Sequence, residues 1–286
     1  MNDFKIANDI EAFKDYSGMN DSQMSSELGI PRSTISNWRT GRTSPTKSSL
    51  ELVYSYLYGK GYRLNLLKEQ ILKDSQSERK VVLFHGSKDC LDGPVSLDHS
   101  EESNDFGRGF YMGDSFLQSA SFVCNYPNSS VYMLKLDLTG DAKVVEYNVD
   151  TEWMLTIAYF RGKLRDYERS SVLKEILSRT AGADIIKAPI ADNRMFQILD
   201  EFIDGNITDL QCKSALSATD LGKQFVIVTD RGLKSLEVLE HCYLCKPEKS
   251  DYLKAKAEYN HVSSQKVKFV KREYAGKGRY IEEVLT

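Results

Sequence analysis

Hydrophobic residues near the N-terminus recur at the spacing of amphipathic helices. In the run Asp21–Leu28, Met24 and Leu28 lie four positions apart and therefore share one helical face. Asp21 is the expected N-cap, because its side chain can accept hydrogen bonds from the first backbone N–H groups. Gly29 supplies a tight turn directly after this helix. The pattern predicts a short helix that ends in a sharp change of direction.

A second helix is predicted over Arg32–Arg39. Pro31 suits its start, because the missing proline N–H has no partner in the first helical turn. Ile35 and Trp38 are expected to face the core, and Leu50–Leu57 to close the bundle as a further helix. The other side of the second helix and the loop after it carry polar and basic side chains that can reach base edges or phosphates. These candidate DNA-binding residues are Arg32, Ser33, Thr34, Ser36, Asn37, Arg39 and Arg42.

The stretch Ser26–Trp38, with Gly41 after it, resembles the helix-turn-helix of the phage-repressor (Cro/lambda-repressor-like) family. The resemblance implies a DNA-binding domain at residues 1–65 that contacts DNA through residues 21–47. Such modules work on paired half-sites, so we expect a homodimer. The alternative is a small helical bundle that dimerises or holds a partner protein.

A different pattern begins after a predicted linker at residues 66–79. Val81–Phe84 is a continuous apolar run, typical of a short buried strand. His85, Gly86 and Ser87 follow at its end. They place a polar side chain at the rim of a sheet and leave the backbone open to close approach by a ligand.

A dense block, Asp105–Gly113, follows the polar segment 88–104, for which no regular structure is predicted. Two glycines precede Phe110 and Tyr111, which suggests a strand entered through a tight turn. Because side chains alternate along a strand, the two aromatic residues are expected on opposite faces. A helix is predicted over Ser115–Tyr126.

These blocks resemble the ADP-ribosyltransferase superfamily, in the diphtheria-toxin and poly(ADP-ribose) polymerase branch that carries a His-Tyr-Glu triad. The resemblance places His85 and Tyr111 in the first two positions, and Gln224, which leads a late strand Gln224–Asp230, in the glutamate position. More narrowly, residues 80–240 are similar to an uncharacterised bacterial family inside that superfamily, which also has a glutamine-led strand. The implied fold class is α+β: an all-α helix-turn-helix bundle, then a mixed α/β core with the split β-sheet of ADP-ribosyltransferases.

The resemblance implies that NAD is a substrate whose nicotinamide–ribose bond breaks through an oxocarbenium-like transition state. His85 would hydrogen-bond the adenosine-side ribose, the Gly86 backbone would hold the nicotinamide amide, and Tyr111 would stack on the nicotinamide ring. The implied catalytic residues are His85, Tyr111 and Gln224. The implied NAD-binding residues are His85, Gly86, Ser87, Gly109, Phe110 and Tyr111.

Gln224 can make the hydrogen bond of the superfamily's glutamate, but it carries no charge. Losing a charge-assisted hydrogen bond could raise the barrier by about 2–4 kcal/mol. Asp192 is the candidate for a compensating acid or for a group that holds the acceptor. If charge limits the reaction, changing Gln224 to glutamate is expected to raise the rate.

The leading interpretation is a NAD-dependent mono-ADP-ribosyltransferase that acts on a protein or nucleic-acid acceptor, used as a toxin or anti-phage effector. One alternative, favoured by the uncharged Gln224, is a DNA-binding transcriptional regulator that senses NAD or a related nucleotide without turnover. A further alternative is a NAD glycohydrolase, with water as the acceptor.

A helix is also predicted around Trp153. Its apolar residues Trp153, Met154 and Leu155 are expected in the core. The basic residues that follow are interpreted as a solvated helix face, with contact to phosphate as the alternative. They are Arg161, Lys163, Arg165 and Arg169.

The composition, 41% apolar and 28% charged residues, is typical of a globular protein. No apolar run approaches the roughly 18 residues of a membrane helix, and residues 1–13 lack a signal-peptide pattern. We therefore expect a cytoplasmic protein without a membrane partner. An odd number of cysteines, five, indicates a reducing compartment. His241, Cys242 and Cys245 form only half of a zinc site, so no metal is expected.

Charge is uneven along the chain, with a net +1 over residues 1–63, +4 over residues 246–286 and −8 between them. Within the basic tail, residues 251–259 suggest a short polar helix. Residues 266–271 alternate like an edge strand. We expect the tail, residues 241–286, to pack on the second domain, and contact with nucleic acid is the alternative.

Overall fold

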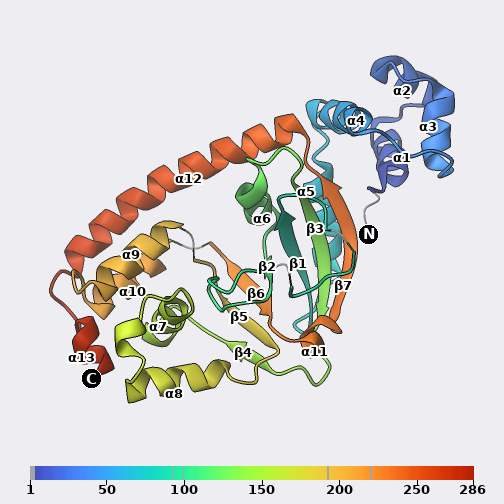
Figure 1. Ribbon diagram of the computed structural model, residues 1–286. Helices are drawn as coiled ribbons and strands as arrows, with labels where there is room; N and C mark the ends of the chain where they lie inside the picture. Colours follow the sequence, from blue (N-terminus) through green and yellow to red (C-terminus); the bar gives the residue numbers. More distant parts are fainter. Residues whose placement is uncertain (1–3, 92, 99, 192, 220) are drawn as a thin grey trace. The chain divides into compact units, whose positions relative to one another are not determined.

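The computed structural model describes residues 4–91, 93–98, 100–191, 193–219 and 221–286 (Figure 1). In this described part, a helical N-terminal region accompanies a mixed sheet, which confirms the α+β class. The N-terminal helices are α1 (Ile6–Ser17), α2 (Asp21–Leu28), α3 (Arg32–Arg39), α4 (Lys47–Gly59) and α5 (Leu64–Asp74). The later ones are α6 (Phe116–Val123), α7 (Thr151–Phe160), α8 (Ser171–Thr180), α9 (Asn193–Ile203), α10 (Asp209–Ser217), α11 (Asp230–Leu233), α12 (Lys246–Glu273) and α13 (Ile281–Leu285), with a 3-10 turn at Arg165–Tyr167.

Helices α2 and α3 form where the hydrophobic spacing predicts them. Met24, Leu28, Ile35 and Trp38 are all buried in the bundle. Gly29, between the two helices, has φ +64°, a conformation that glycine adopts at little cost. The predicted pair of short helices and its tight turn are therefore confirmed.

The predicted N-cap of α2 was wrong by one residue. Asn20 is the cap, because its side chain accepts hydrogen bonds from the N–H groups of Ser22 and Gln23, at 2.9 and 3.1 Å. Gln23 in turn accepts from the Asn20 N–H at 2.9 Å, which completes a capping box. Asp21 instead forms an ion pair with Lys14 at 2.7 Å. Asparagine and aspartate cap equally well, so only the glutamine three residues later distinguishes the two positions.

Seven strands in the described residues form one sheet in the order β4-β5-β6-β2-β1-β3-β7. Strand β6 pairs antiparallel with both β2 and β5, and β4 pairs parallel with β5. The prediction that His85 directly follows the first strand was wrong, because this strand continues through Ser87 and includes His85. The strands are β1 (Lys80–Ser87), β2 (Phe110–Gly113), β3 (Ser130–Asp137), β4 (Val144–Glu146), β5 (Ile185–Pro189), β6 (Lys223–Ile227) and β7 (Leu236–Tyr243).

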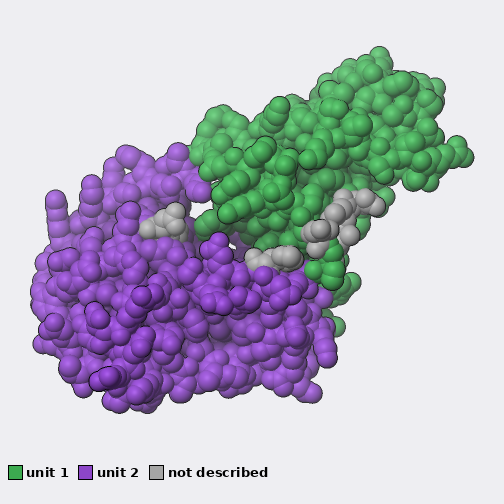
Figure 2. Space-filling view, viewed as in Figure 1, with its two compact units in different colours: residues 1–94, 116–135, 237–255 green, residues 95–115, 136–236, 256–286 purple. Residues whose placement is uncertain are grey.

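The chain divides into two compact units, each assembled from segments far apart in the sequence (Figure 2). Unit 1 comprises residues 1–94, 116–135 and 237–255, and unit 2 comprises residues 95–115, 136–236 and 256–286. These units divide the chain differently from the predicted ranges 1–65, 66–79, 80–240 and 241–286. The difference arises because compactness depends on contacts between distant segments, which local composition does not record.

Unit 1 has two hydrophobic clusters, one inside the helical bundle around Trp38 and Leu57, and one around Phe84. Residues 66–79, predicted as a linker that includes a polar helix, contain most of α5, and Leu72 of this helix packs against the second cluster. The segment is therefore helical and contributes to the core of unit 1.

Buried charges join the bundle to the rest of unit 1. Asp9 of α1 is only 3% exposed and accepts a hydrogen bond from the Tyr54 hydroxyl at 2.6 Å. The Lys68 ammonium of α5 lies 2.6 Å from the same carboxylate and 3.3 Å from Glu240 of β7. A buried carboxylate needs such partners, so these contacts hold α1, α4, α5 and β7 together.

Unit 2 is built around a single large hydrophobic cluster that includes residues of β5, β6 and the helices α7 to α10. Trp153, Met154 and Leu155 are fully buried in it, as predicted. Their helix α7 begins at Thr151, where the side chain of Asp150 caps the Trp153 N–H at 2.8 Å.

The C-terminal tail contains a long helix where the sequence suggested a short helix and an edge strand. Helix α12 runs for 28 residues, so the strand predicted at 266–271 was wrong. Ser263 and Val267 are buried while Phe269 is 68% exposed, which is helical and not alternating burial. Although α12 is long, it contains many charged residues. Within the described ranges, the helices lack the combined length and apolar character needed to cross a membrane.

Candidate active site

Tyr111 and Gln224 lie on one face of the sheet, on the neighbouring strands β2 and β6. The antiparallel register pairs Tyr111 with Val226 and Gly113 with Gln224. Directly paired residues point to the same side of a sheet, and residues two apart on a strand share that side. Tyr111 and Gln224 are therefore diagonal cross-strand neighbours. The fold brings these two predicted catalytic residues together within unit 2.

The Tyr111 side chain is tied to the turn that precedes its own strand. Its hydroxyl donates to the Gly107 carbonyl at 2.7 Å and accepts from the Phe106 N–H at 3.0 Å. Burial raises the pKa of the phenol above its usual range. The phenol therefore stays protonated near neutral pH, where its hydroxyl orients the turn.

Gln224 is 6% exposed and uses its amide group to join two segments. The Nε2 atom lies 3.0 Å from Asp105 Oδ2 and 3.0 Å from the Pro189 carbonyl oxygen. Both neighbours are acceptors, so the nitrogen and not the oxygen of the amide must face them. Gln224 is thus the donor that connects the turn at Asp105 with the end of β5.

Asp105, itself 6% exposed, has a second partner in Arg161. The guanidinium donates to Asp105 Oδ1 through Nε at 3.0 Å and through one terminal nitrogen at 2.7 Å. It also lies over the ring of Phe196, with its carbon 3.5 Å from the ring centroid. Arg161 and Gln224 therefore hold the two carboxylate oxygens separately. We call Asp105, Arg161 and Gln224 the Asp105 cluster.

The contacts of Gln224 explain why an amide occupies this position. A glutamate would place carboxylate oxygens against Asp105 and against the Pro189 carbonyl, with no hydrogen to share at neutral pH. The amide supplies two N–H donors to the same two acceptors. The negative charge absent from residue 224 is present one contact away, on Asp105.

Two of the predicted NAD-binding glycines are required by close packing. A Cβ atom at Gly109 would lie 2.7 Å from Val226 Cγ1 and 2.8 Å from the Ile227 carbonyl oxygen. A Cβ atom at Gly86 would lie 2.4 Å from the Ser119 carbonyl oxygen of α6. A larger residue would force the backbone apart at either place, so the packing alone accounts for both glycines.

His85, Gly86 and Ser87 are half-buried at the end of β1, in unit 1. Phe110, on β2 next to Tyr111, is buried and paired with Ile227. The predicted His85, Tyr111 and Gln224 set is thus divided between the two units. Asp192, the predicted auxiliary acid, lies outside the described residues.

The predicted half zinc site is dispersed in unit 1. Cys242 and Cys245 belong to different hydrophobic clusters. Burial raises the pKa of both thiols, that of Cys245 to about 12. His241 points elsewhere, with its Nε2 atom 2.9 Å from the Ser130 hydroxyl. Among the residues that the structure describes, no group of three or more histidine, cysteine, aspartate or glutamate side chains is placed to hold a metal.

The predicted DNA-binding residues form the outer side of α3 and the loop after it. The buried residues of this helix are Ile35 and Trp38, so the remaining polar side chains point away from the core. Arg32, Ser33, Arg39 and Arg42 are exposed, and Thr34, Ser36 and Asn37 are half-buried.

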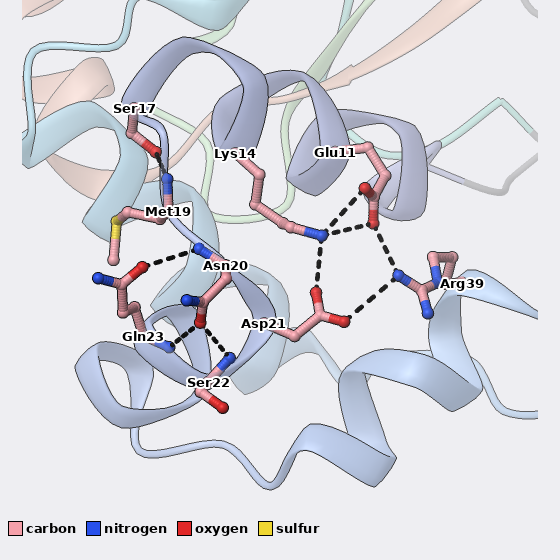
Figure 3. Close-up of polar contacts among 9 residues, drawn as sticks. All are labelled: Glu11, Lys14, Ser17, Met19, Asn20, Asp21, Ser22, Gln23 and Arg39. Carbon is pink, nitrogen blue, oxygen red and sulfur yellow. Dashed lines mark hydrogen bonds and ion pairs between the residues drawn. The ribbon is translucent and has the colours of Figure 1, made fainter.

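Arg39 differs from the other residues of this surface because it has partners within the bundle (Figure 3). Its guanidinium lies 3.1 Å from Glu11 of α1 and 3.5 Å from Asp21 of α2. Lys14 bridges the same two carboxylates, at 3.1 and 2.7 Å, and its hydrogen bond lowers the pKa of Asp21. Arg39 therefore helps to fix α3 against α1 and α2.

Residues 81–238 match a family model described as "Protein of unknown function (DUF3990)". The match covers more than half of the chain. The chain belongs to the DUF3990 family. No curated protein and no solved structure gives a significant match. The DUF3990 region begins in β1 and ends in β7, so it includes every predicted catalytic residue together with Asp105 and Arg161.

Asp105 and Arg161 are the two members of the Asp105 cluster that were not predicted as site residues from the sequence. Arg161 was interpreted as part of a solvated helix face, which was wrong. Helix α7 ends at Phe160, and Arg161, at the C-cap, reaches Asp105 and Phe196. Asp105 begins a glycine-rich turn, which indicates an acid held close to the backbone. The sequence does not predict which side chains contact it.

Proposed function

We propose that this DUF3990 protein is a NAD-dependent mono-ADP-ribosyltransferase whose N-terminal bundle binds DNA. One observation carries the proposal. The buried Gln224 amide donates to the Asp105 carboxylate at 3.0 Å, and Gln224 shares a sheet face with Tyr111. An amide and a carboxylate in contact supply the hydrogen-bonding group and the charge that the glutamate of an ADP-ribosyltransferase combines in one side chain.

In the proposed reaction, the bond between ribose C1′ of NAD and the nicotinamide nitrogen breaks. Its electron pair leaves with nicotinamide, which neutralises the pyridinium ring. The nucleophilic atom of a macromolecular acceptor forms the new bond to C1′ and releases a proton. The positive charge that develops on the ribose needs a fixed negative group in a site of low dielectric constant, and we assign that task to Asp105.

Arg161 acts as a positioning residue in this scheme. It binds Asp105 Oδ1 through two N–H groups, whereas Gln224 binds Oδ2. A carboxylate fixed from both sides loses little energy to reorganisation when charge develops beside it. Tyr111 offers its ring to nicotinamide, and His85 is assigned to the adenosine-side ribose, as the resemblance to ADP-ribosyltransferases implies.

The proposed DNA contact is supported by the chemistry of α3. Ile35 and Trp38 hold one side of the helix in the core, and the exposed Arg32 and Arg42 offer charge on the other. Arginine suits both phosphate and guanine recognition. A DNA-bound transferase would modify an acceptor present at that DNA.

The test uses the full chain and NAD labelled in its adenylate half, incubated with protein, DNA and RNA fractions while free nicotinamide is assayed. We expect label in one fraction, lost in His85→Ala and Asp105→Asn and kept in the matched control Arg169→Ala, an exposed arginine. Circular dichroism of each variant separates lost activity from lost fold. Label that persists in both His85→Ala and Asp105→Asn would contradict the proposal.

A second function, a DNA-binding regulator that senses NAD without turnover, is favoured by a different observation. The Tyr111 hydroxyl and the Gln224 amide both form hydrogen bonds with other groups of the protein. Such a regulator predicts that NAD changes the affinity for DNA while no nicotinamide is released. Nicotinamide release without label in any fraction would instead identify a NAD glycohydrolase.

A further inference from the structure

A cavity of about 460 Å³ opens in unit 2 beside the turn that holds Tyr111. Three segments line it: the loop before β2, the end of α7 with the turn after it, and the 3-10 turn. The Asp105 cluster does not contribute to its lining. The side chains that define its chemistry are Glu102, Arg108, Tyr159, Phe160, Arg165 and Glu168.

Two glycines and one leucine give the cavity its shape. Gly107 and Gly162 both have positive φ, +74° and +72°, so each allows a turn that another residue would strain. A Cβ atom at Gly107 would lie 3.1 Å from the Phe160 ring. Leu164, which also lines the cavity, is 1% exposed, so part of the lining is fixed in the core. The aromatic wall therefore rests on rigid neighbours.

The walls combine aromatic rings with charges of both signs. Tyr159 and Phe160 lie at 77° to each other with their centroids 5.6 Å apart, so they present a face and an edge. Arg108 pairs with Glu102 at 2.9 Å, but their side chains are 50% and 83% exposed. Such exposed pairs are weak, so a phosphate can replace the glutamate as the partner of Arg108. Arg165 and Glu168 add a second cation and a second acceptor.

We infer that this cavity is a nucleotide site separate from the proposed NAD site, and that it binds one nucleotide unit, a nucleobase with its ribose and phosphate. The base would stack on the aromatic rings, which accept any nucleobase. The arginines would bind the phosphate through charge-assisted hydrogen bonds, and the carboxylates would accept from ribose hydroxyls or base amines. An inorganic anion would leave the aromatic wall and both glutamates unused. The volume lies within the range of small-ligand pockets, roughly 300–1,000 Å³.

The unit could come from a free mononucleotide or from one residue of a single-stranded nucleic acid. The experiment therefore titrates the full chain, without NAD, with 5′-AMP, with 5′-CMP and with a short single-stranded oligothymidylate. Ribose 5-phosphate serves as the probe without a base. Binding is measured by calorimetry for the wild type and for Arg165→Ala, Tyr159→Ala and the control Arg169→Ala, which changes a nearby arginine outside the lining.

We expect at least one nucleotide probe to bind and ribose 5-phosphate to bind more weakly. Arg165→Ala should weaken nucleotide binding about tenfold or more, the equivalent of one lost charge-assisted hydrogen bond. Arg169→Ala should leave it unchanged. Binding of a free mononucleotide identifies a small-molecule site, and binding of the oligonucleotide alone identifies a strand.

Three results would overturn the inference. One is that no nucleotide probe binds, or that the bound probe is unaffected by both Arg165→Ala and Tyr159→Ala. Another is that ribose 5-phosphate binds as tightly as 5′-AMP, which would leave the base without a role. The third is that labelled NAD competes with 5′-AMP and loses its own binding in Arg165→Ala, since the cavity would then be part of the NAD site.

Discussion

The outer side of α3 and the Asp105 cluster contain similar residue types in opposite surroundings. Arg32 and Arg42 are exposed, and the side of α3 that carries Arg32 points away from a small core. Asp105 and Gln224 are each 6% exposed, and the Gln224 amide donates a hydrogen bond to the Asp105 carboxylate. Polar residues on an exposed face lose little hydration free energy when the protein folds, and they are available to a ligand. Buried polar residues persist only when the chain itself satisfies them.

In the DUF3990 region, a residue with a proposed role in catalysis also has structural partners. Gln224 stands where the resemblance implies a ligand contact, yet its amide already holds Asp105 and the Pro189 carbonyl. Removing it would disturb the fold as well as any chemistry. On α3, by contrast, a substitution is expected to change binding with little effect on folding, Arg39 being the exception that the structure identifies.

The largest effect is expected from Asp105→Ala. The variant leaves the Arg161 guanidinium without its carboxylate and the Gln224 amide without one acceptor. Loss of one partner of a buried pair costs 3–5 kcal/mol, and because Arg161 is 31% exposed we expect about 3 kcal/mol. Urea unfolding of the full chain measures this loss.

Glu102→Ala is the matched control, because Glu102 is an acid whose only described ion pair, with Arg108, is exposed. It should leave the unfolding midpoint unchanged. A midpoint for Asp105→Ala that equals that of the control would show that the Asp105 cluster does not stabilise unit 2.

Gln224→Glu comes next, with an expected loss of about 1–3 kcal/mol at neutral pH, the cost of unsatisfied buried polar groups. The neighbouring Asp105 would raise the pKa of the new carboxyl above its unfolded value of about 4.3. A raised folded pKa means that the variant is least impaired below about pH 4.3 and becomes less stable, relative to the wild type, as pH rises through the folded pKa.

Unfolding midpoints of Gln224→Glu and of the wild type, compared across a pH series, test this expectation. A difference between them that is independent of pH would mean that the two carboxyl groups do not interact. A faster reaction in the variant, with its stability unchanged, would support the simpler idea that charge at residue 224 limits the rate.

Arg42→Ala should change DNA binding and leave stability almost unaltered. If Arg42 contacts a phosphate, affinity for duplex DNA falls and the slope of log K against log salt concentration decreases by about 1. Fluorescence anisotropy over a range of salt concentrations measures both quantities. Lys73→Ala, a change of a basic residue in α5, provides the control, and an identical slope in both variants would argue against a DNA-binding role for this surface.

The smallest effect on the salt slope is expected from Arg39→Ala. Glu11 and Asp21 already neutralise the charge of the Arg39 guanidinium, so the Arg39→Ala substitution should leave the salt slope close to that of the wild type. A slope reduced as much as in Arg42→Ala would show that Arg39 exchanges its carboxylate partners for phosphate when DNA binds. The same anisotropy measurement distinguishes the two results.

Local patterns were sufficient for the short helices α2 and α3, for three of the seven described strands, β1, β2 and β6, and for the buried positions of α3. They were insufficient where two neighbouring residues have the same preference for a position, as with Asn20 and Asp21 at the N-cap of α2. They were misleading at residues 266–271, because alternation over six residues is too short to distinguish a strand from one side of a long helix.

The sequence by itself determined the paired helices around Gly29, the buried strand that begins near Val81 and the position of Tyr111 on a strand. Each depends on hydrophobic spacing or on the conformational preference of one residue, which neighbours in the chain already define. Only the tertiary structure decided that Asp105, Arg161 and Gln224 meet, and that α5 packs into unit 1. These contacts join segments up to 119 residues apart, and local sequence does not encode which distant group will satisfy a buried charge.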